Sequence, residues 1–289
     1  QLTDHVNVTL ANAAGDTREL RLPLARTKPV YGPWPRTTEH ARLEGNIGYL
    51  RLPGMESDRA FLDGLERAMA SFADTRGLVI DVRGNGGGSR DALRLLLPYF
   101  LDPEGGPRVV NVAAYRHRPD DVRGSAEGYL DNRYLWPLAS QRWSAEERAA
   151  IETAAASFTP AWIPSPELFS DWHHMVVRPG AAHYDRPVVV LMDTGCFSAT
   201  DIFLAAFADT TDATLLGTPS GGGSGRSRSA TLAETGLRLR LSSMASFRVG
   251  GEGYDGVGVS PDVALEQTAA DLLDGGNDSQ LEAAVQLLR

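Results

Sequence analysis

Cysteine and lysine are almost absent from this chain of 289 residues. Cys196 is the one cysteine, so the chain can form neither an internal disulfide nor a cysteine-ligated metal cluster. Only Lys28 of the 28 basic residues is a lysine. This scarcity removes nearly every candidate for a catalytic lysine.

Long apolar runs and clusters of basic residues are also missing. The longest apolar runs, such as 187–192, fall far short of the roughly 20 residues that span a bilayer, so we exclude an integral membrane protein. A net charge of −9 without a basic cluster argues against nucleic acid and anionic lipid as partners. Hydrophobic residues make up 42% of the chain, which allows a sizeable core and argues against disorder.

The beginning of the chain differs in pattern from the rest. Residues 6–11 and 18–24 alternate apolar and polar side chains around a turn signal, which predicts two strands of a hairpin or sheet edge. The proline-rich segment that follows predicts a boundary. We therefore divide the chain into an N-terminal β segment (1–26), a linker (27–45) and a core (46–289). The chain starts at Gln1 rather than Met and shows no charged-then-apolar leader, which indicates a processed protein or a fragment.

The core alternates between predicted strands and helices. Helical periodicity marks residues 61–72, 92–100 and 197–208, and apolar runs predict strands at 47–53, 77–82, 109–115, 186–193 and 213–217. This alternation predicts an α/β fold with a mainly parallel sheet and crossover helices. The pattern breaks down between 116 and 185, an aromatic-rich stretch that we interpret as an insertion with short helices around 144–157. Ser279 and Glu282 have the spacing of a capping box and predict a terminal helix.

A glycine-rich turn follows the buried strand at 77–82. Its sequence, DVRGNGGGSRDA, runs from strand to helix, and glycines there let backbone amides face a cavity. It matches a dinucleotide fingerprint poorly, because Ser89 stands where the third glycine is needed. An oxyanion hole and a simple strand–helix turn both stay open as interpretations.

A serine lies at the second strand–turn–helix junction, MDTGCFSATDIFLAAF. Ser198 would project above the sheet at the N-terminus of a helix and face a cleft, where amides and the helix dipole are available. Serine is also a favoured N-cap, which is the alternative without chemistry. Cys196 is a rival nucleophile, although small buried cysteines usually serve packing alone.

Two further glycine-rich segments lie near the end of the core. Residues 217–229 lack the lysine of a phosphate-binding loop, and their glycines and serines predict a mobile loop beside an active cleft. The segment YDGVGVSPDV carries Asp255 and Asp262 and by itself indicates only a turn.

Together these motifs resemble the C-terminal processing peptidases and, more closely, their tricorn-type branch. The resemblance runs from about Asn46 to the end, through GYLRLPGM, GLVIDVRGNGGG, SATDIF, LLGTPSGGGSG, GVGVSPDV and DSQLEAAVQLL. It implies a ClpP/crotonase-like core, and it implies that residues 1–26 are the end of a PDZ-like domain.

The resemblance also assigns roles to residues. It implies Ser198 as the nucleophile, the amides of Ala199 and Gly88 as the oxyanion hole, and Asp255 as the acid that orients the base. A Ser/Lys dyad is excluded, because Gly223 occupies the position of the lysine and arginine stays protonated. The tricorn branch uses a histidine, which the resemblance places upstream of the PDZ-like domain. His173 and His174 are the candidates within this chain, with buried structural histidines as the alternative.

The function expected from these observations is that of a serine peptidase, for C-terminal processing or oligopeptide degradation, acting on peptide or protein substrates. No cofactor and no metal is implied. A homo-oligomer is compatible with the resemblance, and the resemblance alone favours a periplasmic, secreted or otherwise exported protein. The alternative is an incomplete or retired relative that binds peptides or apolar ligands, and a crotonase-like acyl transferase is a third candidate.

Overall fold

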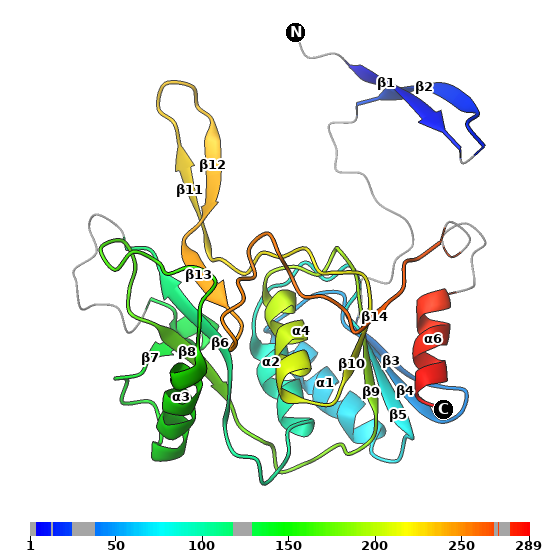
Figure 1. Cartoon of the computed structure of the whole chain (residues 1–289). Helices are drawn as coiled ribbons and strands as arrows, with labels where there is room; N and C mark the ends of the chain where they lie inside the picture. Colours follow the sequence, from blue (N-terminus) through cyan, green and yellow to red (C-terminus); the bar gives the residue numbers. More distant parts are fainter. Residues whose placement is uncertain (1–3, 13, 25–37, 118–128, 269–270, 272–277) are drawn as a thin grey trace. The chain divides into compact units, whose positions relative to one another are not determined.

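The structure, a computed structural model, describes residues 4–12, 14–24, 38–117, 129–268, 271 and 278–289 (Figure 1). The chain divides into two compact units, Gln1–Pro35 and Arg36–Arg289. In the first unit, β1 (His5–Ala11) and β2 (Thr17–Pro23) form an antiparallel hairpin, which confirms the two predicted strands. The assignment of this unit to a PDZ-like domain stays a prediction.

A six-stranded sheet forms the centre of the second unit, in the order β14-β10-β9-β5-β4-β3. Its strands are β3 (Glu39–Leu43), β4 (Ile47–Arg51), β5 (Gly77–Asp81), β9 (Val188–Met192), β10 (Thr214–Gly217) and β14 (Val263–Ala264). All neighbouring pairs are parallel except β3 with β4, so the predicted mainly parallel α/β sheet is confirmed. Strand β3 lies within the segment expected to be linker, because its pairing with β4 makes it an edge strand of this sheet.

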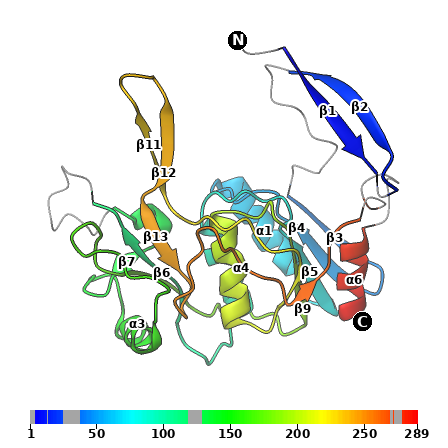
Figure 2. The same ribbon diagram turned by 45° about the horizontal axis from the view of Figure 1, so that its top comes forward.

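Helices cover both faces of this sheet (Figures 1 and 2). Helices α1 (Arg59–Ser71), α2 (Asp91–Leu96) and α4 (Ala199–Thr210), with the short helix η1 (Leu97–Tyr99), pack against the side chains of Leu78 and Ile80. Helix α6 (Ser279–Leu287) packs on the opposite face, against Val79 and its neighbours. The alternation along β5 therefore separates two apolar layers.

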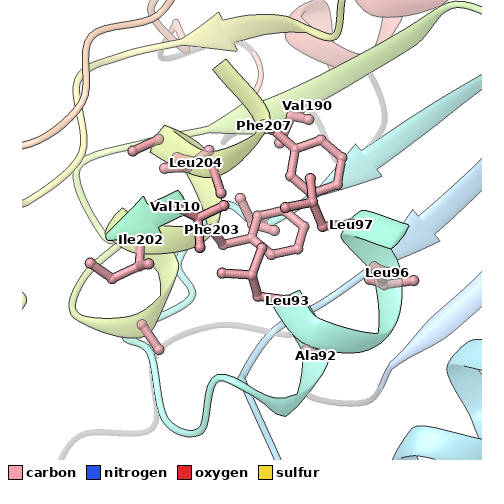
Figure 3. Packing of buried hydrophobic residues seen from close by; sticks show 14 of the residues in the cluster. Ala92, Leu93, Leu96, Leu97, Val110, Val190, Ile202, Phe203, Leu204 and Phe207 are labelled. Atoms are coloured by element: carbon pink, nitrogen blue, oxygen red, sulfur yellow. The ribbon is translucent and has the colours of Figure 1, made fainter. Parts of the chain in front are cut away.

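The layer between α2 and α4 is packed with aromatic and aliphatic side chains (Figure 3). Phe203 and Phe207 of α4 stack with ring centroids 4.5 Å apart, and both belong to the same cluster as Leu93 and Leu97. This packing fixes the axis of α4, and with it the position of the residue at the start of that helix.

A second, antiparallel sheet lies beside the first, in the order β13-β6-β8-β7. It contains β6 (Arg108–Tyr115), β7 (Trp136–Pro137), β8 (His173–Val177) and β13 (Met244–Phe247). The strand predicted at 109–115 is thus present as β6, but outside the parallel sheet, because its partners come from the insertion and from β13. The insertion also supplies α3 (Ala145–Ser157), which begins with a capping box between Ser144 and Glu147 and confirms the predicted helix.

An exposed hairpin extends from this second sheet, formed by β11 (Ser227–Thr231) and β12 (Arg238–Ser242) (Figures 1 and 2).

The terminal helix α6 is present as predicted, but its N-cap is Asp278 rather than Ser279, and the Asp278 side chain accepts a hydrogen bond from the Leu281 amide. No helix in the described part of the chain is long and apolar enough to cross a membrane.

Candidate active site

Ser198 stands between the end of β9 and the start of α4. It is the N-cap of α4, yet its side chain makes no capping hydrogen bond, and its backbone has φ +61° and ψ −114°. A residue with a side chain rarely adopts a positive φ, and such strain concentrates at functional sites. The N-cap interpretation therefore does not account for this serine, whose hydroxyl is left available.

The turn before Ser198 is fixed by one carboxylate. Asp193 Oδ1 accepts hydrogen bonds from the amides of Gly84 at 2.7 Å and Gly195 at 2.9 Å. This contact joins the two glycine-containing turns that follow β5 and β9. The strain at Ser198 is therefore supported by a turn that is itself held in place.

Ser198 lines a cavity of about 570 Å³ and is half-buried. Several segments form the cavity: residues 84–88 after β5 (the glycine strip), the start of α4, the insertion, the β11–β12 hairpin, and the loops that contain residues 222–225 and 255. The lining residues are Gly86, Arg133, Phe197, Ser198, Gly222, Gly223, Gly225, Ser227, Arg240, Leu241, Ser242 and Asp255. The predicted placement of Ser198, at a helix N-terminus beside a cleft, is confirmed. Its role as nucleophile stays a prediction.

The glycine strip approaches Ser198 closely. Gly87 has φ +94°, and a Cβ at this position would lie 2.5 Å from the Phe197 carbonyl oxygen and 2.7 Å from Ser198 Cβ. The Gly87 amide donates to Asn85 Oδ1 at 2.9 Å, whereas no described atom accepts a hydrogen bond from the Gly88 amide. The Gly88 amide is therefore unpaired among the described residues, but Gly88 lines a separate cavity of about 350 Å³. Gly86 is the glycine of this strip that lines the Ser198 cavity, so the role of Gly88 in an oxyanion hole stays a prediction.

Asn85 is a site residue that the sequence analysis did not identify. It is completely buried, and its side chain donates to the Leu52 carbonyl at 2.8 Å and accepts from Thr200 Oγ1 at 2.8 Å. The backbone carbonyl of Asn85 accepts a hydrogen bond from the Phe197 amide at 3.0 Å. Asn85 therefore ties the glycine strip to the first turn of α4 on both sides of Ser198.

Asp201 is a second residue that the sequence analysis missed. It is fully buried in the first turn of α4, and burial raises the pKa of its carboxyl, although hydrogen bonds from Ser220, Gly223, Gly222 and Ser198 oppose the shift. An acid three residues after an N-cap serine has the spacing of a capping box, which is the signal in the sequence that could have identified it.

The segment after β10 contacts this carboxylate, and the mobility predicted for residues 220–229 stays a prediction. Asp201 accepts from the Ser220 hydroxyl at 2.6 Å and from the Gly222 and Gly223 amides at 3.2 and 3.1 Å. The glycines of this segment permit close packing, since a Cβ at Gly223 would overlap the Phe197 ring. From Ser227 onwards the segment is strand β11.

Asp255 lies on the wall of the cavity that contains Ser198. Its side chain is exposed, and its Oδ1 accepts a hydrogen bond from the Ser224 amide at 2.9 Å. The structure thus brings Ser198 and Asp255, which are far apart in sequence, into one cavity.

His173 and His174 lie elsewhere, in β8. His173 is buried against Tyr115, and its Nδ1 lies 2.8 Å from the Asp171 carbonyl oxygen. Burial, together with the neighbouring His173, lowers the pKa of His174 to about 4. Neither residue, nor any other histidine of the described ranges, is part of the lining of the Ser198 cavity.

Cys196 does not compete with Ser198. It is completely buried, its Sγ donates to the Val82 carbonyl at 3.1 Å, and burial raises the pKa of its thiol far above neutral pH. A protonated, enclosed thiol is a poor nucleophile.

Within the described residues, no group of three or more His, Cys, Asp or Glu side chains is arranged to hold a metal ion.

Comparison with protein families places this site in a known context. The model of peptidase family S41 matches residues 46–265, about three quarters of the chain. The chain belongs to peptidase family S41. The match begins where the predicted core begins and includes Ser198 and Asp255, so the resemblance inferred from the motifs is confirmed at the level of the family.

Individual relatives agree with this assignment. A carboxy-terminal-processing protease of Bartonella bacilliformis is 32% identical over 120 residues, which are 39% of this chain and 27% of that protein. A peptidase structure from Parabacteroides merdae has a TM-score of 0.61 at 23% identity and covers 87% of this chain and 64% of its own. The photosystem II D1 C-terminal processing protease has a TM-score of 0.52 at 19% identity and covers 98% and 59%.

These structural similarities establish the fold of the S41 peptidases. The chain spans about a quarter of the curated relative and less than two thirds of the two structures.

Proposed function

We propose that this chain carries the nucleophile of a serine peptidase, and that Ser198 is that nucleophile. The observation that carries the proposal is the strained backbone of Ser198 at the N-terminus of α4, with its uncapped hydroxyl beside a cavity of about 570 Å³. Membership of peptidase family S41 supports the reaction class.

The proposal includes a site for negative charge next to this serine. In the proposed reaction, Ser198 Oγ attacks the carbonyl carbon of a peptide bond, and its proton passes to a general base. The amides of Ala199 and Gly88 donate to the oxygen that becomes negative. The C–N bond then breaks, the base returns the proton to the leaving amine, and water hydrolyses the acyl ester.

The proposed base is a histidine, because the chain has no lysine in the core and arginine stays protonated. Asp255 would orient that imidazole, since its carboxylate faces the cavity. As His173 and His174 are absent from the cavity lining, we propose that the histidine reaches the cavity from protein outside these 289 residues.

The substrate class follows from the relatives and stays part of the proposal. The name of the Bartonella bacilliformis relative states carboxy-terminal processing, and we propose C-terminal processing or oligopeptide degradation for this protein. Export from the cytoplasm and assembly into a homo-oligomer stay predictions from the family resemblance.

The alternative function is a binding module without catalysis. It is favoured by one observation: among the described residues that line the cavity there is no histidine or lysine. An S41 member that has lost its base would still bind peptides in this cavity.

Labelling with a fluorophosphonate separates the two functions. The full-length protein and the 289-residue chain are treated with the probe, and the modified residue is located by mass spectrometry. We expect a covalent adduct on Ser198 in the full-length protein, which is lost in Ser198→Ala and kept in Ser260→Ala, an exposed serine outside the cavity. An unlabelled Ser198 in the folded full-length protein would overturn the proposal in favour of the binding module.

A further inference from the structure

Arginines concentrate around the Ser198 cavity, although the chain as a whole has a net charge of −9. Arg133 and Arg240 line this cavity. A second cavity, of about 950 Å³, shares Ser227, Leu241 and Ser242 with the first and is lined by three more arginines: Arg116, Arg226 and Arg228. The ion pairs found among the described residues include none of these five arginines.

The acidic side chains that face the two cavities are few. Asp255 lines the first cavity and Glu167 the second. Among the described residues that line the two cavities, arginines therefore outnumber carboxylates. An excess of one sign in a cleft attracts ligands of the opposite sign and raises their local concentration.

The backbone around Arg133 is held by residues at the start of α2. Arg90, at the start of α2, donates to the Arg133 carbonyl at 3.1 Å. Tyr134 has a left-handed backbone with φ +57°, its hydroxyl bonds to Asp91, and the Arg94 guanidinium lies 3.9 Å from its ring centroid. The backbone of Arg133 is thereby fixed relative to α2 and to the glycine strip that precedes this helix.

The guanidinium of Arg133 lacks a matching partner. Its Nε is buried and has no hydrogen-bond partner in the described structure. Burial, followed by the nearby charge of Arg226, lowers the pKa of this guanidinium. Both effects penalise the charged form of Arg133, and a carboxylate placed beside it would relieve them.

Arg240 reaches the same cavity from the hairpin. Its Nε donates to Ser227 Oγ at 2.7 Å across the two strands, which orients the guanidinium and leaves its terminal nitrogens for a ligand. Arginine is suited to this task, because its planar group can form two parallel hydrogen bonds to a carboxylate.

We propose that Arg133 and Arg240 bind a carboxylate of the peptide substrate beside Ser198. The inference rests on the proposed peptidase function and specifies its substrate class: peptides that place an acidic group near the bond to be cleaved. That group is either the free C-terminal carboxylate or the side chain of a glutamate or aspartate. Among the described residues, neither Asp255 nor Glu167 forms an ion pair with Arg133 or Arg240.

The test measures binding in the Ser198→Ala background, so that it does not depend on catalysis. Four alanine-rich dodecapeptides with a neutral fluorophore are compared by anisotropy. One has no acidic side chains and a free C-terminus, and the second is its amide. The third is an amide with three central glutamates, and the fourth is its glutamine counterpart.

We expect one acidic peptide to bind about tenfold more tightly than its neutral counterpart, a ratio typical of one charge-assisted contact. Preference within the first pair identifies a C-terminal carboxylate, and preference within the second identifies a side chain. Arg133→Gln and Arg240→Gln should each reduce the ratio to about twofold or less. The control Arg238→Gln, on the same exposed strand but outside the cavity lining, should leave it unchanged.

Equal binding within both pairs would overturn the inference, and so would an equal loss in Arg238→Gln. If Arg133→Gln fails to fold, Arg240→Gln on the exposed hairpin decides alone. Fluorophosphonate labelling of Ser198 in the two arginine variants is the separate check on the peptidase function, because the probe carries no carboxylate. Unchanged labelling with lost preference supports both proposals, whereas absent labelling with intact preference contradicts the peptidase function alone.

Discussion

Asp201 Oδ1 accepts a hydrogen bond from the Ser220 hydroxyl at 2.6 Å, which connects the first turn of α4 to the loop after β10. The same carboxylate accepts hydrogen bonds from the Gly222 and Gly223 amides, and both glycines line the cavity of Ser198. We therefore predict that Asp201 is a positioning residue, which fixes one wall of the cavity relative to Ser198.

Asp201→Asn should detach this wall. The asparagine amide group would face at least one of the four donors to this carboxylate, and an unsatisfied buried group costs about 1–3 kcal/mol of the free energy of unfolding. A displacement of about 1 Å at a catalytic site can reduce kcat about a hundredfold. We expect slower labelling of Ser198 and a lower kcat, measured beside Asp212→Asn, an exposed acid just after α4. Unchanged labelling and stability in Asp201→Asn would show that the contact has no positioning role.

Gly87→Ala should disturb Ser198 through the backbone. The new Cβ would lie 2.5 Å from the Phe197 carbonyl and 2.7 Å from Ser198 Cβ, and φ is +94°. We expect the free energy of unfolding to fall by about 2–4 kcal/mol, because overpacking and an unfavourable φ act together. The control is Gly86→Ala, where a Cβ meets nothing within 4 Å and which should change stability by about 0.5 kcal/mol or less. Urea denaturation of both variants measures the difference.

The sequence predicted the strands and the placement of Ser198 because those depend on local patterns. Buried strands such as β5 and β9 are continuous apolar runs, and Ser198 follows one of them directly. The partner of a strand is not a local property. Strand β6 is rich in valine and buried like β9, yet it pairs with β8 of the insertion and with β13.

The contacts that rigidify the site were also outside the reach of local patterns. The glycines at 221–223 do not indicate by themselves which side chains pack against them. The neighbours are Asp201 and Phe197, which the fold brings to the loop. Asn85 likewise acts through Leu52 and Thr200, residues on two other segments.

His174 should make stability depend on pH. Its folded-state pKa is about 4 against an ordinary value of 6.5, so the unfolded chain binds more protons between these values. The contribution is fully present above pH 6.5 and is lost as the pH falls towards 4, by about 3 kcal/mol for a shift of this size. His174→Gln should flatten this part of the profile of unfolding free energy, and His183→Gln, at an exposed histidine, should not. Parallel profiles for His174→Gln and the unsubstituted protein would contradict a buried neutral imidazole.

The same histidines allow a test of where the general base comes from. His173 and His174 are buried in β8 and absent from the lining of the Ser198 cavity. A general base typically contributes about 10²–10⁴-fold to the rate, so its removal is easily measured. If the base comes from protein outside these 289 residues, the double variant His173→Gln/His174→Gln of the full-length protein should keep kcat within a few-fold, about the change expected from altered packing alone. A loss of more than about a hundredfold, in a variant whose circular dichroism shows a native fold, would instead place the base in β8. That result would require β8 to move towards Ser198 when substrate binds, because an imidazole nitrogen must come within roughly 3 Å of the hydroxyl to accept its proton.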